Sequence, residues 1–104
     1  MTNLKVRIIR LWDLGWYPGW AECVLVDAFG VEHRFRDKIP VASRRNITPE
    51  DVPCDGVVRC TKEADHLDGT VTVNTQLPDD IESTAGEHLF RVFPSQLTDG
   101  EVFP

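Results

Sequence analysis

Thiols and imidazoles are the first groups in this chain that could do chemistry. Three cysteines and three histidines occur in 104 residues, which is enough for one zinc site. The spacing argues against such a site, because five residues separate Cys54 from Cys60 and no two histidines are separated by three. Cys23 and Cys60 fall inside apolar runs, where free cysteine usually behaves as a small buried hydrophobe. We therefore predict no metal ligand and no cofactor.

Nucleophilic catalysis would require a thiol or hydroxyl beside a base. Cys23 could face His33 across a hairpin, and Ser83 and Thr84 lie close to His88 in the sequence. Neither set belongs to a nucleophile elbow or a glycine-rich phosphate loop. We expect His33 to be a packing residue and the two hydroxyls to bond to local backbone. No residue is assigned a catalytic role, and the sequence favours a protein that is not an enzyme.

Basic side chains are better candidates for a binding site. Arg34, Arg36 and Lys38 are predicted to line one face of a strand, and two further arginines extend this basic patch over residues 34–45. Together with the tryptophans, the patch has the composition of a barrel that binds single-stranded nucleic acid. The net charge of −6 disfavours that function. We expect cross-strand pairing with acidic residues to neutralise much of the patch, the candidates being Glu32, Asp37, Glu63 and Asp65.

The second half of the chain is acidic. Residues 47–104 carry three basic side chains against twelve acidic ones, whereas residues 1–46 carry eight against five. Asp79, Asp80 and Glu82 lack the spacing and the glycine of a calcium-binding loop. An acidic surface can steer association with a basic protein, as in an immunity protein that masks a basic toxin. We predict that these three residues contact a protein partner.

The aromatic residues are concentrated in one segment. All three tryptophans and the only tyrosine lie within nine consecutive positions, which also contain a proline–glycine turn signal. Trp12 and Trp20 are predicted to pack into the core at the ends of two strands. Trp16 and Tyr17, at the tip of the turn, could either cover the mouth of a barrel or form an exposed binding hot spot.

Short alternating apolar runs must position these side chains. They predict six strands, over residues 4–12, 20–29, 31–38, 56–64, 70–76 and 87–93. Glycine turns join the second strand to the third and the fourth to the fifth. In the connection, residues 39–41 are predicted to be extended around a proline, with one short helical turn near 48–52. The predicted fold class is all-β, a small antiparallel six-stranded barrel or rolled sheet.

Length and composition predict one domain over residues 1–97, followed by a C-terminal tail at 98–104. No apolar run has the length of a transmembrane span or the pattern of a signal peptide. An odd number of cysteines does not suit a secreted disulfide framework. We therefore expect a cytoplasmic protein that does not contact membranes.

The pattern PGWxECxLxDAxGxxHxFxxKxPV, over residues 18–41, resembles one found in small bacterial proteins of about this length. The resemblance implies no named family, activity, ligand or site residue. Our hypothesis is thus a binding module for a protein partner, of the immunity or adaptor type. Single-stranded nucleic-acid binding is the alternative, and metal- or thiol-dependent activity is the third. The residues predicted to bind the partner are Trp16, Tyr17, Arg34, Arg36, Lys38, Asp79, Asp80 and Glu82.

Overall fold

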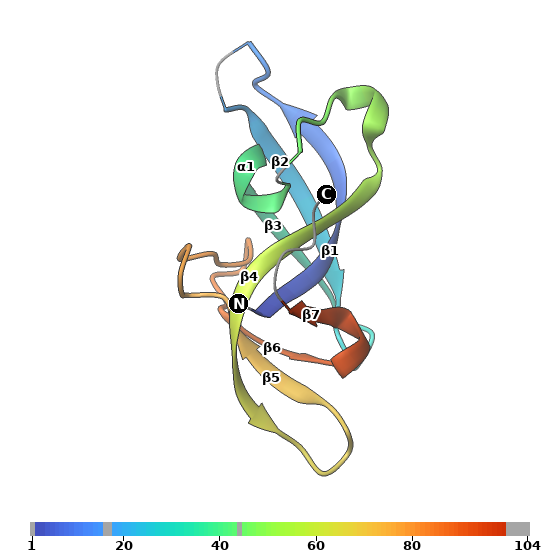
Figure 1. The fold of residues 1–104 in the computed structure, drawn as a ribbon, viewed down its shortest axis with the longest axis vertical. Helices are drawn as coiled ribbons and strands as arrows, with labels where there is room; N and C mark the ends of the chain where they lie inside the picture. The colour runs from blue at the N-terminus through green and yellow to red at the C-terminus, as the bar shows by residue number, and fades with distance from the viewer. Residues whose placement is uncertain (1, 16–17, 44, 100–104) are drawn as a thin grey trace.

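The computed structural model describes residues 2–15, 18–43 and 45–99 (Figure 1). Its strands pair antiparallel in the order β3-β2-β1-β4-β5-β6, and β7 pairs with β1. The sheet is curled into a half-barrel, which confirms the predicted all-β, rolled six-stranded fold. The strands are β1 (Thr2–Trp12), β2 (Trp20–Val26), β3 (Glu32–Lys38), β4 (Cys54–Asp65), β5 (Val71–Asn74), β6 (Leu89–Val92) and β7 (Leu97–Asp99).

The alternation of apolar and charged residues decides which side of the sheet is inside. In β1, Leu4, Val6 and Ile8 are buried, whereas Lys5 and Arg7 between them are exposed. The same period of two continues in the paired strands. The concave side of the curl therefore contains the core, and the charged side chains lie on the opposite side.

The two ends of the strand order meet and close the curl. Phe35 of β3 packs edge-to-face on Phe90 of β6 with ring centroids 5.3 Å apart, a favourable aromatic geometry. The Ala28 N–H after β2 donates to the carbonyl of Arg91 in β6 (2.9 Å). A single apolar interior thus joins strands that are far apart in the sequence.

A β-bulge in β1 changes the direction of the side chains that follow it. Ile8 pairs with Cys23 but Arg10 pairs with Glu22, so one extra residue lies in β1 between them. After the bulge, Arg10 and Trp12 point away from the core. The predicted core positions of both Trp12 and Trp20 are therefore wrong, because these residues pair on the outer side of the sheet and are only half-buried.

The segment after β3 is helical where the sequence predicted an extended chain. Helix α1 spans Ile39–Ala42, with Lys38 extended before it and Pro40 in its first turn. Proline is tolerated there because N–H groups of a first turn have no partner within the helix. The Ile39 N–H donates to the carbonyl of Gly19 (3.1 Å), and the Ile39 side chain is buried. Tertiary contacts therefore override the local preference of the residue before proline.

Helix α1 packs on the sheet at a glycine of β4. A Cβ atom at Gly56 would lie 2.8 Å from the carbonyl oxygen of Ala42 and 2.8 Å from the side chain of Ile8. Only glycine allows helix and sheet to approach this closely.

The predicted short turn near 48–52 is present as the 3₁₀ helix η1 (Pro49–Asp51). The Thr48 N–H donates to the carboxylate of Asp51 (2.7 Å) and caps this turn. A second 3₁₀ helix, η2 (Pro94–Gln96), leads into β7. No helix in the described ranges has the length and apolar character to cross a membrane.

Candidate binding surface

The convex side of β1, β2 and β3, here called the outer face, carries an ordered array of side chains. Strand register places these side chains in rows that run across the three strands. One row is aromatic, the next is ionic, and the third is mixed. The rows are Trp12, Trp20 and Lys38; Arg10, Glu22 and Arg36; and Arg7, Val24 and Arg34.

The outer face is basic although the protein as a whole is acidic. It carries two acidic side chains, Glu22 and Glu32, against six basic ones across β1–β3: the five of the rows and Lys5, which is exposed on β1. One of the cations is partly neutralised from β4, since Arg7 pairs with Asp55 (2.8 Å). The remaining positive charge lies on β1 and β3, on either side of the single acid of β2.

The centre of this face is a buried carboxylate. The side chain of Glu22 is 8% exposed and lies beneath three arginines that are about half exposed. Its oxygens accept from Arg36 Nε (2.9 Å), Arg34 NH1 (3.0 Å) and Arg10 NH2 (3.4 Å). One glutamate therefore fixes three guanidinium groups of two strands in a single cluster.

The electrostatics of this cluster keep Glu22 ionised. Burial by itself raises the pKa of the carboxyl group, but the hydrogen bond from Arg36, the charges of Arg10 and Arg36, and the hydrogen bond from Arg34 outweigh it. The net effect lowers the pKa of Glu22 below its ordinary value of 4.5. The carboxylate is thus a permanent acceptor near neutral pH.

The aromatic row is packed against itself and against the ionic row. Trp12 and Trp20 stack with ring centroids 6.2 Å apart and planes at 21°. The guanidinium of Arg10 lies 4.8 Å from the centre of the Trp12 ring, a cation–π contact. These contacts occupy ring surface on which an unpaired nucleic-acid base would otherwise stack.

Sequence reasoning identified part of this site. Arg34, Arg36 and Lys38 do lie on one face of β3, and the expected pairing with Glu32 is present at Arg34 (3.0 Å). The principal partner, Glu22, was missed. Its signal is a single acid within the apolar run of β2, at a position that alternation places opposite the core.

The three acids predicted to contact a partner do not lie on the outer face. Trp16 and Tyr17 fall outside the described residues. Asp79 forms a bidentate pair with Arg59 of β4 (2.6 and 2.9 Å). Asp80 and Glu82 are exposed, 3.6 and 3.7 Å from the Nε2 atom of His88. These three acids belong to the connection between β5 and β6 (residues 75–88, the β5–β6 loop), so the predicted residues are divided between two regions.

The free edge of β3 is protected against addition of a strand. The Thr84 N–H of the β5–β6 loop donates to the carbonyl of Arg34 (2.8 Å). Further along, the carboxylate of Asp37 accepts from the Lys38 N–H (2.8 Å). Occupied backbone groups and charged side chains are the usual protection of an edge strand. Two backbone groups of β3 are thus bonded within the chain, whereas the side chains of its outer face remain about half exposed.

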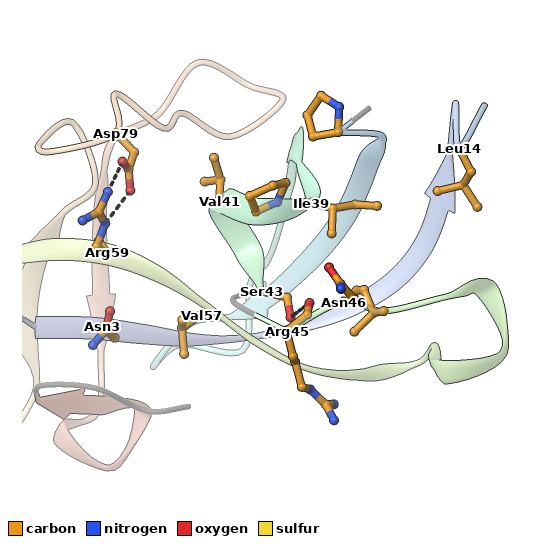
Figure 2. Close-up of a pocket in the computed structure, with 13 residues that line it drawn as sticks. Asn3, Leu14, Ile39, Val41, Ser43, Arg45, Asn46, Val57, Arg59 and Asp79 are labelled. Carbon is orange, nitrogen blue, oxygen red and sulfur yellow. Dashed lines mark hydrogen bonds and ion pairs between the residues drawn. The ribbon is translucent and has the colours of Figure 1, made fainter. Parts of the chain in front are cut away.

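A groove of about 550 Å³ lies between α1 and β4 (Figure 2). At one end Arg59 is directed towards Asp79, whereas Arg45 extends away from this pair. A small-molecule site needs polar groups that converge on one point, and these groups do not. The apolar part of the groove is formed by Leu14, Ile39, Val41, Ile47 and Val57.

The cysteines do not resemble a reactive centre. Burial raises the pKa of the Cys23 thiol to about 12, with smaller contributions from the charges of Asp37, Cys54 and Glu22. Burial likewise raises the pKa of Cys60 to about 11. A nucleophilic cysteine requires the opposite shift.

His33 is held by an acid and an aromatic ring. His33 bonds through Nε2 to Asp27 (2.7 Å) and packs on Phe90, with centroids 5.0 Å apart. Over residues 2–15, 18–43 and 45–99, no three histidine, cysteine, aspartate or glutamate side chains are arranged to hold a metal ion.

Comparison of the chain with protein-family models, with curated proteins and with solved structures gives no match.

Proposed function

We propose that this protein is a binding module that recognises a protein partner through the outer face of β1–β3, as an immunity or adaptor domain does. The observation that carries the proposal is the Glu22 carboxylate beneath three guanidinium groups, next to a stacked tryptophan pair. Arginine and tryptophan are the residues most enriched at interface hot spots. Side chains that are already ordered lose less conformational entropy when a partner binds.

The chemistry of the face favours a partner with acidic groups. A guanidinium has five N–H donors, and each arginine of the cluster uses only one or two of them on acids of the same face. The remaining donors can bind a carboxylate of a partner while Glu22 keeps its own bonds. Contact of Asp79, Asp80 and Glu82 with a basic region of a partner is the competing prediction from the sequence, and the experiment below sets it against the outer face.

Single-stranded nucleic acid is the second candidate ligand. The adjacent aromatic and ionic rows favour it, because stacking rings beside cations are the usual composition of such sites. The net charge of −6 and the occupied ring surface of Trp12 disfavour it.

A paired capture experiment tests the proposal. Three baits are used on a lysate of the source cells, with and without nuclease: the native protein, Arg34→Ala/Arg36→Ala, and the control Asp80→Asn/Glu82→Gln. Both double variants change two charges, but only the first changes the outer face. Circular dichroism and thermal melting confirm that each bait is folded.

We expect one protein to be retained by the native and control baits, after nuclease treatment, and lost from the Arg34→Ala/Arg36→Ala bait. Capture that disappears with nuclease would instead support the nucleic-acid alternative. A protein retained by the arginine variant but lost from the control would contradict the outer face as the binding surface.

A further inference from the structure

An exposed sheet face with six basic side chains and a stacked tryptophan pair has the ingredients of a general polyanion-binding surface. Glu22 interrupts it at the centre, between Arg10 and Arg36 in the middle row. Its side chain is almost fully buried, so it cannot turn into solvent to make room for a competing anion.

We propose that Glu22 is a specificity-determining residue that prevents the outer face from binding the phosphate backbone of nucleic acids. It leaves the face able to accept isolated carboxylate groups. Acceptance of a partner carboxylate rests on the proposed function, whereas exclusion of phosphate is a property of this chain alone.

The geometry of the arginines gives the reason. Strong phosphate binding uses guanidinium forks that present two parallel N–H groups to one anion. Arg36 directs Nε, and Arg34 and Arg10 each direct one terminal nitrogen, towards Glu22 (2.9, 3.0 and 3.4 Å). Each arginine therefore has one N–H group held by Glu22, which restricts how its remaining donors can align in parallel on a phosphate. A phosphate that approached the cluster would also be repelled by the fixed carboxylate.

Glu22 should repel a single-stranded nucleic acid more strongly than it repels one carboxylate of a partner. Affinity for nucleic acid comes from many phosphate contacts in succession, each of which releases a counterion. A negative charge at the centre of the face interrupts that succession. One partner carboxylate at the rim, for example on the free donors of Arg34, does not have to pass over Glu22.

The same face contains a matched control. Glu32 also pairs with Arg34 (3.0 Å), but its side chain is 50% exposed and it lies at the start of β3. An exposed glutamate can move away from its arginine into water, so it should not restrict the guanidinium in the same way. Neutralising either glutamate adds the same charge to the outer face, and only burial and the number of arginine partners differ.

The test measures binding of a fluorescent oligothymidylate by anisotropy at low salt. Glu22→Gln is expected to bind at least about tenfold more tightly than the native protein, with an affinity that falls as salt rises. Glu22→Asp, which retains a carboxylate, should remain close to the native protein. Glu32→Gln should change the affinity less than about threefold, because it adds one charge and frees one exposed arginine.

Two further variants make the result decisive. Glu22→Leu removes the charge and the hydrogen-bond acceptor together, and the half-exposed arginines that lose Glu22 can turn into water. It should therefore gain affinity as Glu22→Gln does, and circular dichroism shows whether each variant is folded. Adding Arg34→Ala and Arg36→Ala to Glu22→Gln should abolish the gain.

Affinity of Glu22→Gln and Glu22→Leu no higher than that of Glu32→Gln would overturn the inference, as would a gain that survives loss of both arginines. Tight oligothymidylate binding by the native protein would overturn it as well, and would also count against a protein partner. Failure of the capture experiment alone would refute the proposed function but leave the role of Glu22 against phosphate intact.

Discussion

The outer face of β1–β3 and the β5–β6 loop both carry dense charge, but they use it differently. On the outer face one carboxylate, 8% exposed, is shared by three arginines. In the loop, Asp79 is paired one-to-one with Arg59, and the side chains of Asp80 and Glu82 are 81% and 59% exposed. The difference shows that a run of charges in the sequence does not mark a site. A buried charge shared by several partners is the stronger basis for the site that we propose.

The loop owes its conformation to other residues. Ile81 is 1% exposed in the core, and its N–H donates to the carbonyl of Thr75 (3.0 Å). The Thr75 hydroxyl donates to the carbonyl of Ile81 (2.5 Å). These bonds hold the loop in place, while the side chains of Asp80 and Glu82 remain exposed to solvent. On the outer face, in contrast, the charged groups themselves determine how the surface is ordered.

The largest expected effect is from Glu22→Ala. Loss of the shared acceptor should lower the free energy of unfolding by about 2–3 kcal/mol, below the cost of breaking a fully buried pair because the arginines can turn into water. Urea denaturation followed by tryptophan fluorescence measures it. Glu32→Ala is the control and should change the free energy by less than about 0.5 kcal/mol. Equal effects of the two substitutions would show that burial and sharing by three arginines add no stability at Glu22.

Asp79→Asn should have an intermediate effect. Asp79 is 17% exposed and Arg59 37% exposed, and their contact is bidentate. Such a pair is stronger than an ordinary surface ion pair, so we expect a loss of about 1 kcal/mol in the same urea experiment. A loss larger than that of Glu22→Ala would make the loop, and not the outer face, the principal ionic cluster.

The pH dependence of stability should sharpen the comparison further. Because folding lowers the pKa of Glu22, its contribution is present above the ordinary pKa of 4.5 and is lost as the pH falls through the lower folded value. Thermal melts between about pH 6 and pH 3 should therefore show a steeper decline for the native protein than for Glu22→Gln. Some decline should persist in the variant, because the pKa of Asp27 is also lowered. Parallel curves would show that Glu22 is not coupled to the arginines.

The smallest expected effect is from Asp80→Asn combined with Glu82→Gln. Both acids are exposed and more than 3.5 Å from His88, so the free energy of unfolding should change by less than about 0.5 kcal/mol. Differential scanning calorimetry is suited to so small a change. A loss above about 1 kcal/mol would mean that these acids hold the loop in place.

Much of the fold could be predicted from local patterns. The alternation in β1 and β3, and the glycine turns at Gly30 and Gly69, identify strands and hairpins without any tertiary information. Helix α1 could not be predicted, because it depends on the bond between Ile39 and Gly19 and on the space left by Gly56. Neither contact is visible in a pattern of neighbouring residues.

The candidate site was predictable only within one strand. Alternation places Arg34, Arg36 and Lys38 together on β3, but their relation to Glu22 depends on the register between strands. The bulge after Ile8 adds a second requirement, since without it Arg10 would point to the core side. Register and bulges are set by packing across the sheet, so a pattern within one strand does not contain them.

Site-specific photo-crosslinking tests the central claim most directly. A photoreactive amino acid is placed at Val26 on the outer face or at Leu77 in the β5–β6 loop, two apolar side chains of similar exposure (52% and 66%). After irradiation in the source cells, we expect a covalent adduct with a protein partner from position 26 and none from position 77. An adduct from position 77 alone would contradict the assignment of the outer face as the binding surface.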